Sequence, residues 1–330
     1  MSSVRFSVVI PAYNSSAFIE DAVNSIKKQS YDSWELIIVE NGSTDNTYEL
    51  ASTLSDGIRI RVFQSEKGVS NARNKGIEES QGEWMVFLDA DDKLLPDALK
   101  DYNEAISEES DIIVGKYEHS NLSEVSKVVN DTDVKKKEYL QECLLDPTQK
   151  CNIHGVAFRR EYLDEHGIRF EADLTHAEDS EFLIHSLCNG ACVVCIERKV
   201  YSITINNDSA VRSMDVSTIE KYEKSIRRIE RYFTDSDSVI DNSFQVFILS
   251  QLLVVLVNSV YKNLKMSEAN KMARTLCERE IFSKAITKVD LRELPFSRRL
   301  TFKLMKHENY MGLGVIIKGR AFVKKLKNRG

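Results

Sequence analysis

Three carboxylates follow one apolar segment of the chain at a spacing that suits metal binding. Asp89-Ala90-Asp91-Asp92 comes directly after Trp84–Leu88, a run typical of a buried strand. Carboxylates this close repel one another and need a cation or hydrogen-bond donors nearby. Oxygen ligands of this kind suit Mg²⁺ or Mn²⁺, which share their coordination with a diphosphate. A solvated acidic turn capping the helix expected after Pro96 would show the same spacing, so the pattern alone leaves both interpretations open.

Two more polar clusters follow earlier apolar segments. Pro11-Ala12-Tyr13-Asn14 ends one expected strand, and Glu40-Asn41-Gly42-Ser43-Thr44-Asp45 ends the next. Gly42 permits a tight turn, and the Ser, Thr and Asp after it suit a helix start. Such an N-terminus can bind an anionic group, although an ordinary helix cap is the simpler explanation.

The second half of the chain supplies candidates for proton transfer. Glu178 and Asp179 precede Phe182 and an apolar helix face. A carboxylate near an attacking hydroxyl can act as a general base, but acids in a first turn are also favoured by the helix dipole. His154 could approach the molecule that carries the attacking hydroxyl, although a lone histidine is more often a structural residue.

The elements expected around these clusters predict an α/β fold. The strands are expected over Phe6–Pro11, Glu35–Val39, Ile58–Phe63, Trp84–Leu88 and Asp111–Lys116. Segments of helical periodicity lie between them, including Thr44–Leu54, Val69–Ser80 and Pro96–Ser107. This alternation predicts a mostly parallel, Rossmann-like sheet covered by helices on both faces. Ligands of such sheets bind at the carboxyl ends of the strands, where the polar clusters lie.

Beyond the first half the pattern becomes increasingly helical. We expect a helix from Glu178 to about Gly190, strands over Cys192–Glu197 and Val200–Ile205, and helices after Asp215. The predicted organisation is a catalytic domain over residues 1–214 and a helical region over 215–330. The apolar segment Phe244–Tyr261 approaches the length of a membrane span, but its polar stripe favours a buried bundle helix.

Charge and cysteine content narrow the classes of protein. The net charge of −6 argues against a nucleic-acid binder. Ser283–Gly330 holds thirteen Lys/Arg and three Asp/Glu, a net +10, so the remainder carries −16. A basic end suggests an anionic partner such as a membrane surface, although a basic helix face packed on an acidic body fits nearly as well. The six cysteines show no disulfide framework, and we expect a cytoplasmic protein.

The sequence resembles the glycosyltransferase family 2 proteins, whose nucleotide-sugar-binding fold is called GT-A. Four segments carry the resemblance, in the family's order: F-S-V-V-I-P-A-Y-N (6–14), W-E-L-I-I-V-E-N-G-S-T-D-N-T (34–47), G-V-S-N-A-R-N-K-G-I (68–77) and F-L-D-A-D-D (87–92). The resemblance is strong over residues 4–115, weak to about 212 and absent beyond. It implies a GT-A catalytic domain that uses Mn²⁺ or Mg²⁺ and a nucleotide-sugar donor, as in bacterial capsule, exopolysaccharide or lipopolysaccharide synthesis.

The resemblance also implies roles for individual residues. The donor site would comprise Pro11, Ala12, Tyr13, Glu40, Asn41, Arg73, Asn74, Asp89, Ala90, Asp91 and Arg212. Asp91 and Asp92 would hold the metal. Arg73 could instead be a structural salt-bridge partner, so both roles stay open for it. Arg212 lies where relatives have a loop over the diphosphate, although a plain surface loop fits about as well. The family usually has two aspartates at the position of Glu40-Asn41, yet the Asn41 amide oxygen can still accept from a uracil N–H, so a UDP-sugar is expected.

Catalysis would follow from a direct displacement. Glu178 and Asp179 resemble the family's "ED" element, which makes Asp179 the expected base and Glu178 the second choice. A single displacement inverts the anomeric configuration. The acceptor would be a hydroxyl of a glycan or lipid-linked oligosaccharide, which favours peripheral contact with the inner face of the cell membrane. A non-catalytic sugar-nucleotide-binding or scaffold subunit is the alternative, whereas an oxidoreductase is disfavoured because no G-x-G-x-x-G follows the first strand.

Overall fold

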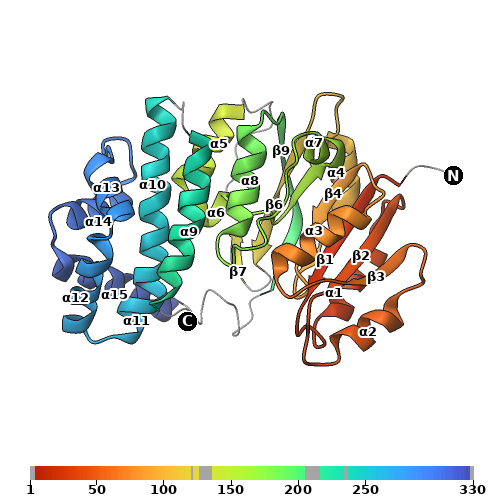
Figure 1. Ribbon diagram of the computed structural model, residues 1–330, viewed down its shortest axis with the longest axis horizontal. Helices are drawn as coiled ribbons and strands as arrows, with labels where there is room; N and C mark the ends of the chain where they lie inside the picture. The colour runs from red at the N-terminus through yellow and green to blue at the C-terminus, as the bar shows by residue number, and fades with distance from the viewer. Residues whose placement is uncertain (1–3, 120–121, 126–135, 205–215, 234–236, 328–330) are drawn as a thin grey trace. The chain divides into compact units, whose positions relative to one another are not determined.

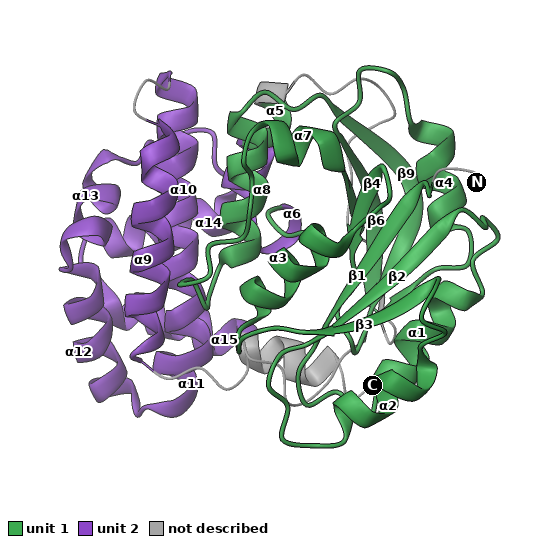
Figure 2. Cartoon of the chain, turned by 45° about the vertical axis from the view of Figure 1, so that its right-hand side comes forward, with its two compact units in different colours: residues 1–140, 151–206 green, residues 141–150, 207–330 purple. Residues whose placement is uncertain are grey.

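The computed structural model describes residues 4–119, 122–125, 136–204, 216–233 and 237–327 (Figure 1). The chain divides into two compact units, coloured separately in Figure 2. Unit 1 comprises residues 1–140 and 151–206, and unit 2 comprises residues 141–150 and 207–330. The sequence places a boundary between residues 214 and 215, whereas the contacts divide the chain after Asn206 and assign the short segment 141–150 to the second unit.

A nine-stranded sheet forms the centre of unit 1, with the order β3-β2-β1-β4-β8-β6-β9-β5 and β7 paired to β6. The strands are β1 Phe6–Ala12, β2 Trp34–Glu40, β3 Ile60–Gln64, β4 Trp84–Phe87, β5 Lys93–Leu94, β6 Ile112–His119, β7 Leu122–Val125, β8 Val156–Arg159 and β9 Val193–Ile203. β1 to β4 pair in parallel, as expected. The other half is mixed, because the short strand β8 lies antiparallel between β4 and β6. The two strands expected near residues 192–205 are one continuous strand, β9.

Helices cover both faces of this sheet, which confirms the expected fold class (Figure 1). They are α1 Ile19–Lys27, α2 Thr47–Leu54, α3 Val69–Glu79, α4 Ala98–Ala105, α5 Lys136–Leu145, α6 Pro147–Lys150, α7 Arg160–Glu165 and α8 Glu178–Cys188, of which α6 and the end of α5 belong to unit 2. Every residue of β1 is buried, because alternate side chains face opposite layers of helices. Val8 and Ile10 pack in one core with α1. Val9 meets α3 on the other face.

Gly76 brings α3 unusually close to the sheet. A Cβ atom at this position would lie 2.2 Å from Cγ1 of Val9, so any side chain would push the helix away from β1. Arg73 lies one turn earlier on the same helix. The close approach at Gly76 therefore helps to place Arg73 near the carboxyl ends of the strands.

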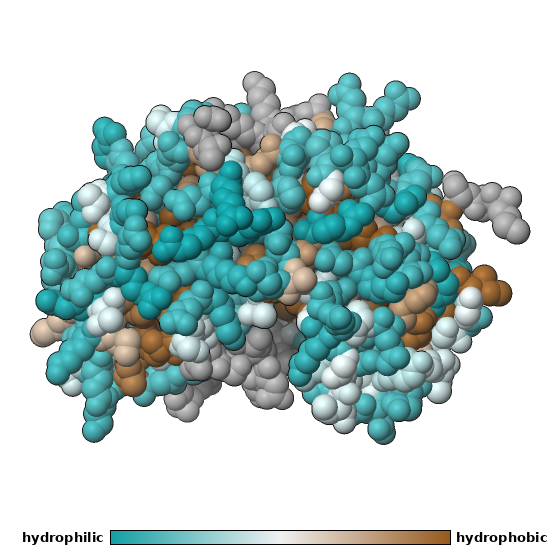
Figure 3. All heavy atoms as spheres, viewed as in Figure 1, coloured by the Kyte–Doolittle hydropathy of each residue, from teal (hydrophilic) through white to brown (hydrophobic). Residues whose placement is uncertain are grey.

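Unit 2 is helical apart from its connections. Its elements are α9 Thr218–Glu230, the 3₁₀ turn η2 Arg231–Phe233, α10 Ser238–Val255, the π-helical turn η3 Leu256–Val260, α11 Tyr261–Asn263, α12 Met266–Cys277, α13 Glu280–Lys288, α14 Phe296–Lys306 and α15 Tyr310–Lys327. In the described part of the chain, Ser238–Asn263 is the one helix long and apolar enough to cross a membrane, and 72% of its apolar window is buried within the protein. Figure 3 shows mainly hydrophilic side chains over the viewed face, with hydrophobic ones visible between them. The burial of Ser238–Asn263 agrees with the bundle helix expected from the sequence.

Candidate active site

Hydrogen bonds join the loops that follow β1 and β2. Asn14 Oδ1 accepts from the Thr44 N–H at 2.8 Å, and the Asp45 carboxylate accepts from the Ser16 hydroxyl at 2.7 Å. Burial alone would raise the pKa of Asp45, but hydrogen bonds from Ser16 and Thr47 lower it to about 2. The Asp45 charge therefore braces two loops at the sheet edge.

Glu40 and Asn41 end β2 in different ways. The Glu40 carboxylate accepts from the Ser43 N–H at 2.5 Å and from the Gln64 amide at 3.1 Å, so it holds its own loop. Asn41 is 4% exposed, and its Oδ1 atom has no hydrogen-bond partner among the described residues. A buried oxygen without a partner costs free energy, which a donor group on a bound ligand would recover.

The residues expected to line a nucleoside pocket lie beside Asn41. The Asn41 N–H donates to the Ala12 carbonyl at 3.1 Å, and both Pro11 and Ala12 are buried. Tyr13 is 41% exposed, and the Lys67 ammonium lies 4.9 Å from its ring centroid. An exposed ring next to a buried amide can stack on a planar base while the amide binds its edge.

Arg73 is the centre of a network of carboxylates. Its guanidinium donates to Asp179 at 2.5 Å, to Asp89 at 3.1 Å and to Glu178 at 3.4 Å. Its side chain is only 3% exposed. Burial acts to lower the pKa of Arg73, but the surrounding carboxylates raise it above its ordinary value. These contacts join α3 to the segment after β4 and to the start of α8, and Arg73 and Asp179 are 106 residues apart in the sequence.

The start of α8 presents two acids from a strained turn. Ala177, directly before the helix, has the left-handed φ of 56° that non-glycine residues rarely adopt. Glu178 and Asp179 form the first turn, and both contact Arg73. Burial and the neighbouring Asp179 raise the pKa of Glu178, although Arg73 acts to lower it. Backbone strain of this kind clusters at functional sites.

Asp89 and Asp92 are fixed by residues from later in the chain. The Tyr201 hydroxyl donates to Asp92 Oδ2 at 2.8 Å and accepts from the Asp89 N–H at 3.1 Å. The Thr204 N–H donates to Asp92 Oδ1 at 2.7 Å. Burial raises the pKa of Asp92 to about 7, and the nearby Asp89 and Asp91 add to the shift. Burial also acts to raise the pKa of Asp89, but the His154 hydrogen bond and the Arg73 charge hold it well below its usual range.

Asp89, Asp92 and His154 form a candidate metal centre. One ligand atom from each lies within 4.8 Å of the others, and His154 Nε2 lies 3.3 Å from Asp89 Oδ2. Two carboxylates and an imidazole suit a divalent cation such as Mn²⁺. The raised pKa of Asp92 marks uncompensated negative charge that a cation would relieve. Of the two expected ligands, Asp92 belongs to this group, whereas Asp91 lies beside it and is half-buried.

The remaining predicted residues differ in what the structure shows. Ala90 is buried between Asp89 and Asp91. Asn74 exchanges two hydrogen bonds with the Phe170 backbone, at 2.7 and 2.9 Å. Arg212 lies outside the described residues. The sequence did not single out Tyr201, because a tyrosine in an apolar strand carries no local signal of the acids that it contacts.

Comparisons with known proteins agree with this geometry. A model of the family described as Glycosyl transferase family 2 matches residues 7–167. EpsH of Bacillus subtilis, named as a glycosyltransferase, is 21% identical over 351 residues that span both proteins entirely. The poly(ribitol-phosphate) beta-N-acetylglucosaminyltransferase TarS of Staphylococcus aureus is 25% identical over 240 residues, which cover 71% of this chain and 41% of TarS.

A solved structure shares the fold. TarS residues 1–349 in complex with UDP-GlcNAc superpose with a TM-score of 0.69 at 21% identity, covering 96% of this chain and 91% of that one. The fold and site therefore define a glycosyltransferase with the GT-A fold. More particularly, residues 7–167 match glycosyltransferase family 2, and the relatives of the chain named above are glycosyltransferases.

Proposed function

We propose that the chain is an inverting glycosyltransferase that moves a sugar from a UDP-sugar to a hydroxyl of a glycan or lipid-linked acceptor during synthesis of a bacterial cell-surface polysaccharide. The observation that carries the proposal is the meeting of Asp89 and Asp179 at one guanidinium, that of Arg73. An acid that follows a strand and an acid that begins a distant helix thereby share one site. A donor-binding group and a proton acceptor must lie together in this way for direct displacement.

The donor base is proposed from the residues at the ends of β1 and β2. The unpartnered Asn41 Oδ1 can accept from the ring N–H of uracil, and the Tyr13 ring is exposed for stacking. TarS, a relative with the same fold, has been solved with UDP-GlcNAc. These features favour UDP as the nucleotide.

The chemistry needs one base and a stabilised leaving group. We assign the base to Asp179, which would take the proton of the acceptor hydroxyl as its oxygen bonds to the anomeric carbon and the bond to the UDP oxygen breaks. Because attack and departure occur on opposite faces, the configuration inverts. Asp89, Asp92 and His154, with Asp91 as the sequence predicts, would hold a divalent cation that supplies positive charge to the leaving diphosphate.

The test is transfer activity with the configuration of the product. UDP release from UDP-GlcNAc and other UDP-sugars is measured with Mn²⁺ and candidate acceptors, and NMR identifies the anomer formed. Asp179→Asn should retain UDP binding but lower kcat by about 10²–10⁴, whereas Glu165→Gln, an exposed acid on α7, should leave it unchanged. A retained configuration would refute direct displacement, and normal turnover of Asp179→Asn would move the base elsewhere.

A non-catalytic sugar-nucleotide-binding or scaffold subunit is the alternative that the sequence left open, because Asn41 stands in place of the family's usual aspartate. It predicts UDP-sugar binding without turnover for every acceptor tried. The presence of acids at positions 89, 91, 92, 178 and 179 favours the enzyme, because a binding subunit has no use for a base.

The proposed location is the cytoplasm, with peripheral contact at the inner face of the cell membrane. Phe296, Met311 and Val315 are 71%, 65% and 60% exposed on α14 and α15, and Arg299 and Lys303 are exposed on α14. Apolar and basic side chains together suit an anionic bilayer. Sedimentation with phosphatidylglycerol but not phosphatidylcholine vesicles is expected, and the double variant Arg299→Glu, Lys303→Glu should reduce it. Equal recovery with both lipids would contradict this location. The side chains after Arg320 lie outside the described part of the tail.

A further inference from the structure

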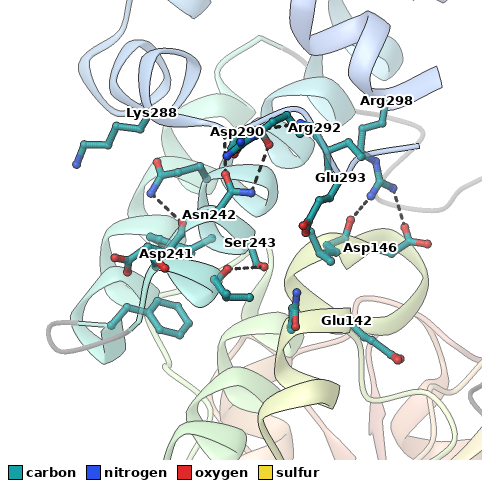
Figure 4. Close-up of a pocket in the computed structure, with 18 of the residues that line it drawn as sticks. Glu142, Asp146, Asp241, Asn242, Ser243, Lys288, Asp290, Arg292, Glu293 and Arg298 are labelled. Carbon is teal, nitrogen blue, oxygen red and sulfur yellow. Dashed lines mark hydrogen bonds and ion pairs between the residues drawn. The ribbon is translucent and has the colours of Figure 1, made fainter. Parts of the chain in front are cut away.

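Unit 2 contains a large cavity that the proposed chemistry does not use. Its volume is about 1020 Å³, and it lies among residues 141–150, the start of α10 and the connection between α13 and α14 (Figure 4). Small-molecule sites in proteins are roughly 300–1,000 Å³. The cavity is therefore large enough for a ligand of more than one ring.

Most wall cations are already neutralised by wall carboxylates. The pairs are Arg298 with Asp146, Lys150 with Glu142, and Arg292 with Asp290. Glu230 and Glu293 form no ion pair with any residue that the structure describes, and Figure 4 shows Glu293 extending toward the middle of the lining residues. Lys288 lies at the edge, with its ammonium pointing away. The unpaired charge in the cavity is therefore negative, which disfavours phosphate-bearing ligands.

The same walls offer an aromatic surface and amide groups. Phe233 is half-buried, and its ring lies 4.9 Å from that of Phe244. Val239 is 46% exposed beside them. The Gln141 side chain forms no hydrogen bond within the described residues, so its amide is available to a ligand. Carboxylate and amide groups bind hydroxyls, and an aromatic ring packs against the C–H face of a sugar.

We propose that this cavity binds a neutral oligosaccharide. Sugar hydroxyls would donate to Glu230 and Glu293, and a ring face would pack on Phe233. That the oligosaccharide is part of the acceptor, away from the hydroxyl that reacts, rests on the proposed function. The binding itself does not, because the cavity is formed by residues of unit 2 and the donor-site residues belong to unit 1.

The test measures binding to the full chain with no donor present. A panel of neutral tetrasaccharides built from hexoses and N-acetylhexosamines is screened by ligand-observed NMR, and affinities of those that bind are measured by calorimetry. Glu293→Gln and Glu230→Gln should each weaken binding about fivefold, because each replaces a charge-assisted hydrogen bond by a neutral one. Ser238→Trp, which places a large ring into the cavity from the first turn of α10, should abolish binding.

Glu268→Gln is the matched control, since Glu268 is an exposed acid on α12 that does not line the cavity. Binding of no neutral oligosaccharide at millimolar concentration would overturn the proposal. So would binding that all three cavity variants leave unchanged, or a preference for basic peptides over sugars. Thermal stabilisation by UDP with Mn²⁺ is measured in parallel. If UDP with Mn²⁺ gives no stabilisation but an oligosaccharide binds, the proposed function fails. If UDP with Mn²⁺ stabilises the protein but no oligosaccharide binds, the proposal that the cavity binds an oligosaccharide fails.

Discussion

Replacing Arg73 by methionine removes the cation that Asp89, Glu178 and Asp179 share. Methionine has a long, flexible and apolar side chain that can occupy most of the space of the arginine stem. The main effect is therefore electrostatic. Three carboxylates are left close together without the guanidinium that now lies 2.5 to 3.4 Å from each.

The expected loss of unfolding free energy is about 3 kcal/mol at pH 8. Removing one partner of a buried ion pair costs roughly 3–5 kcal/mol. Here the three carboxylate side chains remain 15–33% exposed, so hydration recovers part of the cost. The variant also avoids the desolvation of Arg73 itself. We therefore expect a cost at the lower end of the range of roughly 3–5 kcal/mol.

The loss should shrink as the pH falls. In the wild type, Arg73 helps to hold the pKa of Asp89 below its usual range. The stabilisation that the ionised Asp89 gives to the folded state is therefore fully present above about pH 4, and it does not change between pH 8 and pH 5.5. Without Arg73 the pKa values of Asp89 and Glu178 rise, because the positive charge that lowers both is lost, so the native state binds protons that the unfolded state releases. Since one pKa unit corresponds to about 1.4 kcal/mol, the deficit should fall to about 1–2 kcal/mol at pH 5.5.

Urea denaturation followed by tryptophan fluorescence measures this change in unit 1 alone. The chain has two tryptophans, Trp34 and Trp84, and both lie in unit 1. Lys75→Met is the control. Among the described residues Lys75 pairs with Glu78 and Glu79 at the surface of α3, and its loss should cost about 0.5 kcal/mol or less of unfolding free energy. A deficit for Arg73→Met below about 1 kcal/mol, equal at both pH values, would refute the electrostatic role of Arg73.

Four further predictions concern the donor and metal sites. Asn41→Leu removes the acceptor proposed for the base, so calorimetry should show UDP binding about tenfold weaker; unchanged affinity would exclude this contact. Tyr201→Phe removes the hydroxyl that lies between Asp92 and the Asp89 N–H. The Mn²⁺ concentration for half-maximal UDP release should then rise about tenfold, while kcat at saturating Mn²⁺ changes less. A Mn²⁺ titration identical to that of the wild type would contradict this role of Tyr201. The pKa of Asp92 is raised from 3.8 to about 7 in the folded state, so its ionisation destabilises the metal-free protein as the pH rises from about 4 to 7. Asp92→Asn should therefore raise Tm at pH 8 but not at pH 4. A lower Tm of this variant at pH 8 would contradict the prediction. Asp91→Ala should abolish metal-dependent turnover with an unchanged circular dichroism spectrum, and full activity would remove Asp91 from the metal site.

The sequence predicted those parts of the fold that show a repeated local pattern. The four parallel strands and α1 to α4 alternate over lengths that periodicity detects. β8, Val156–Arg159, was not predicted, because it lies outside the regular alternation of strands and helices that indicates β1 to β4. Its antiparallel insertion between β4 and β6 depends on tertiary pairing alone.

The candidate site was predictable where one motif holds the chemistry. Asp89, Asp92, Glu178 and Asp179 stand in short acidic runs, and the structure brings them into one region around Arg73 and His154. Tyr201 lies 109 residues from Asp92, and nothing near it in the sequence indicates the contact. The residues that hold a site in place are thus harder to predict than the charged residues that form it, because their partners are set by the folded chain.

One helix, α3, fixes both the place and the charge environment of the proposed base. Both polar atoms of the Asn74 amide are used by the Phe170 backbone, and the Phe170 ring stacks on Phe182 of α8 at 3.9 Å with an angle of 4°. This chain of contacts holds the start of α8 against α3, and it compensates for the left-handed backbone of Ala177, which costs of order 1 kcal/mol or more. Arg73, the residue before Asn74, then binds the carboxylate of Asp179. Adjacent residues of α3 therefore position the helix that carries the proposed base and pair with Asp179 itself. In the proposed mechanism, the G-V-S-N-A-R-N-K-G segment would thus act on proton transfer as well as on the donor side of the site.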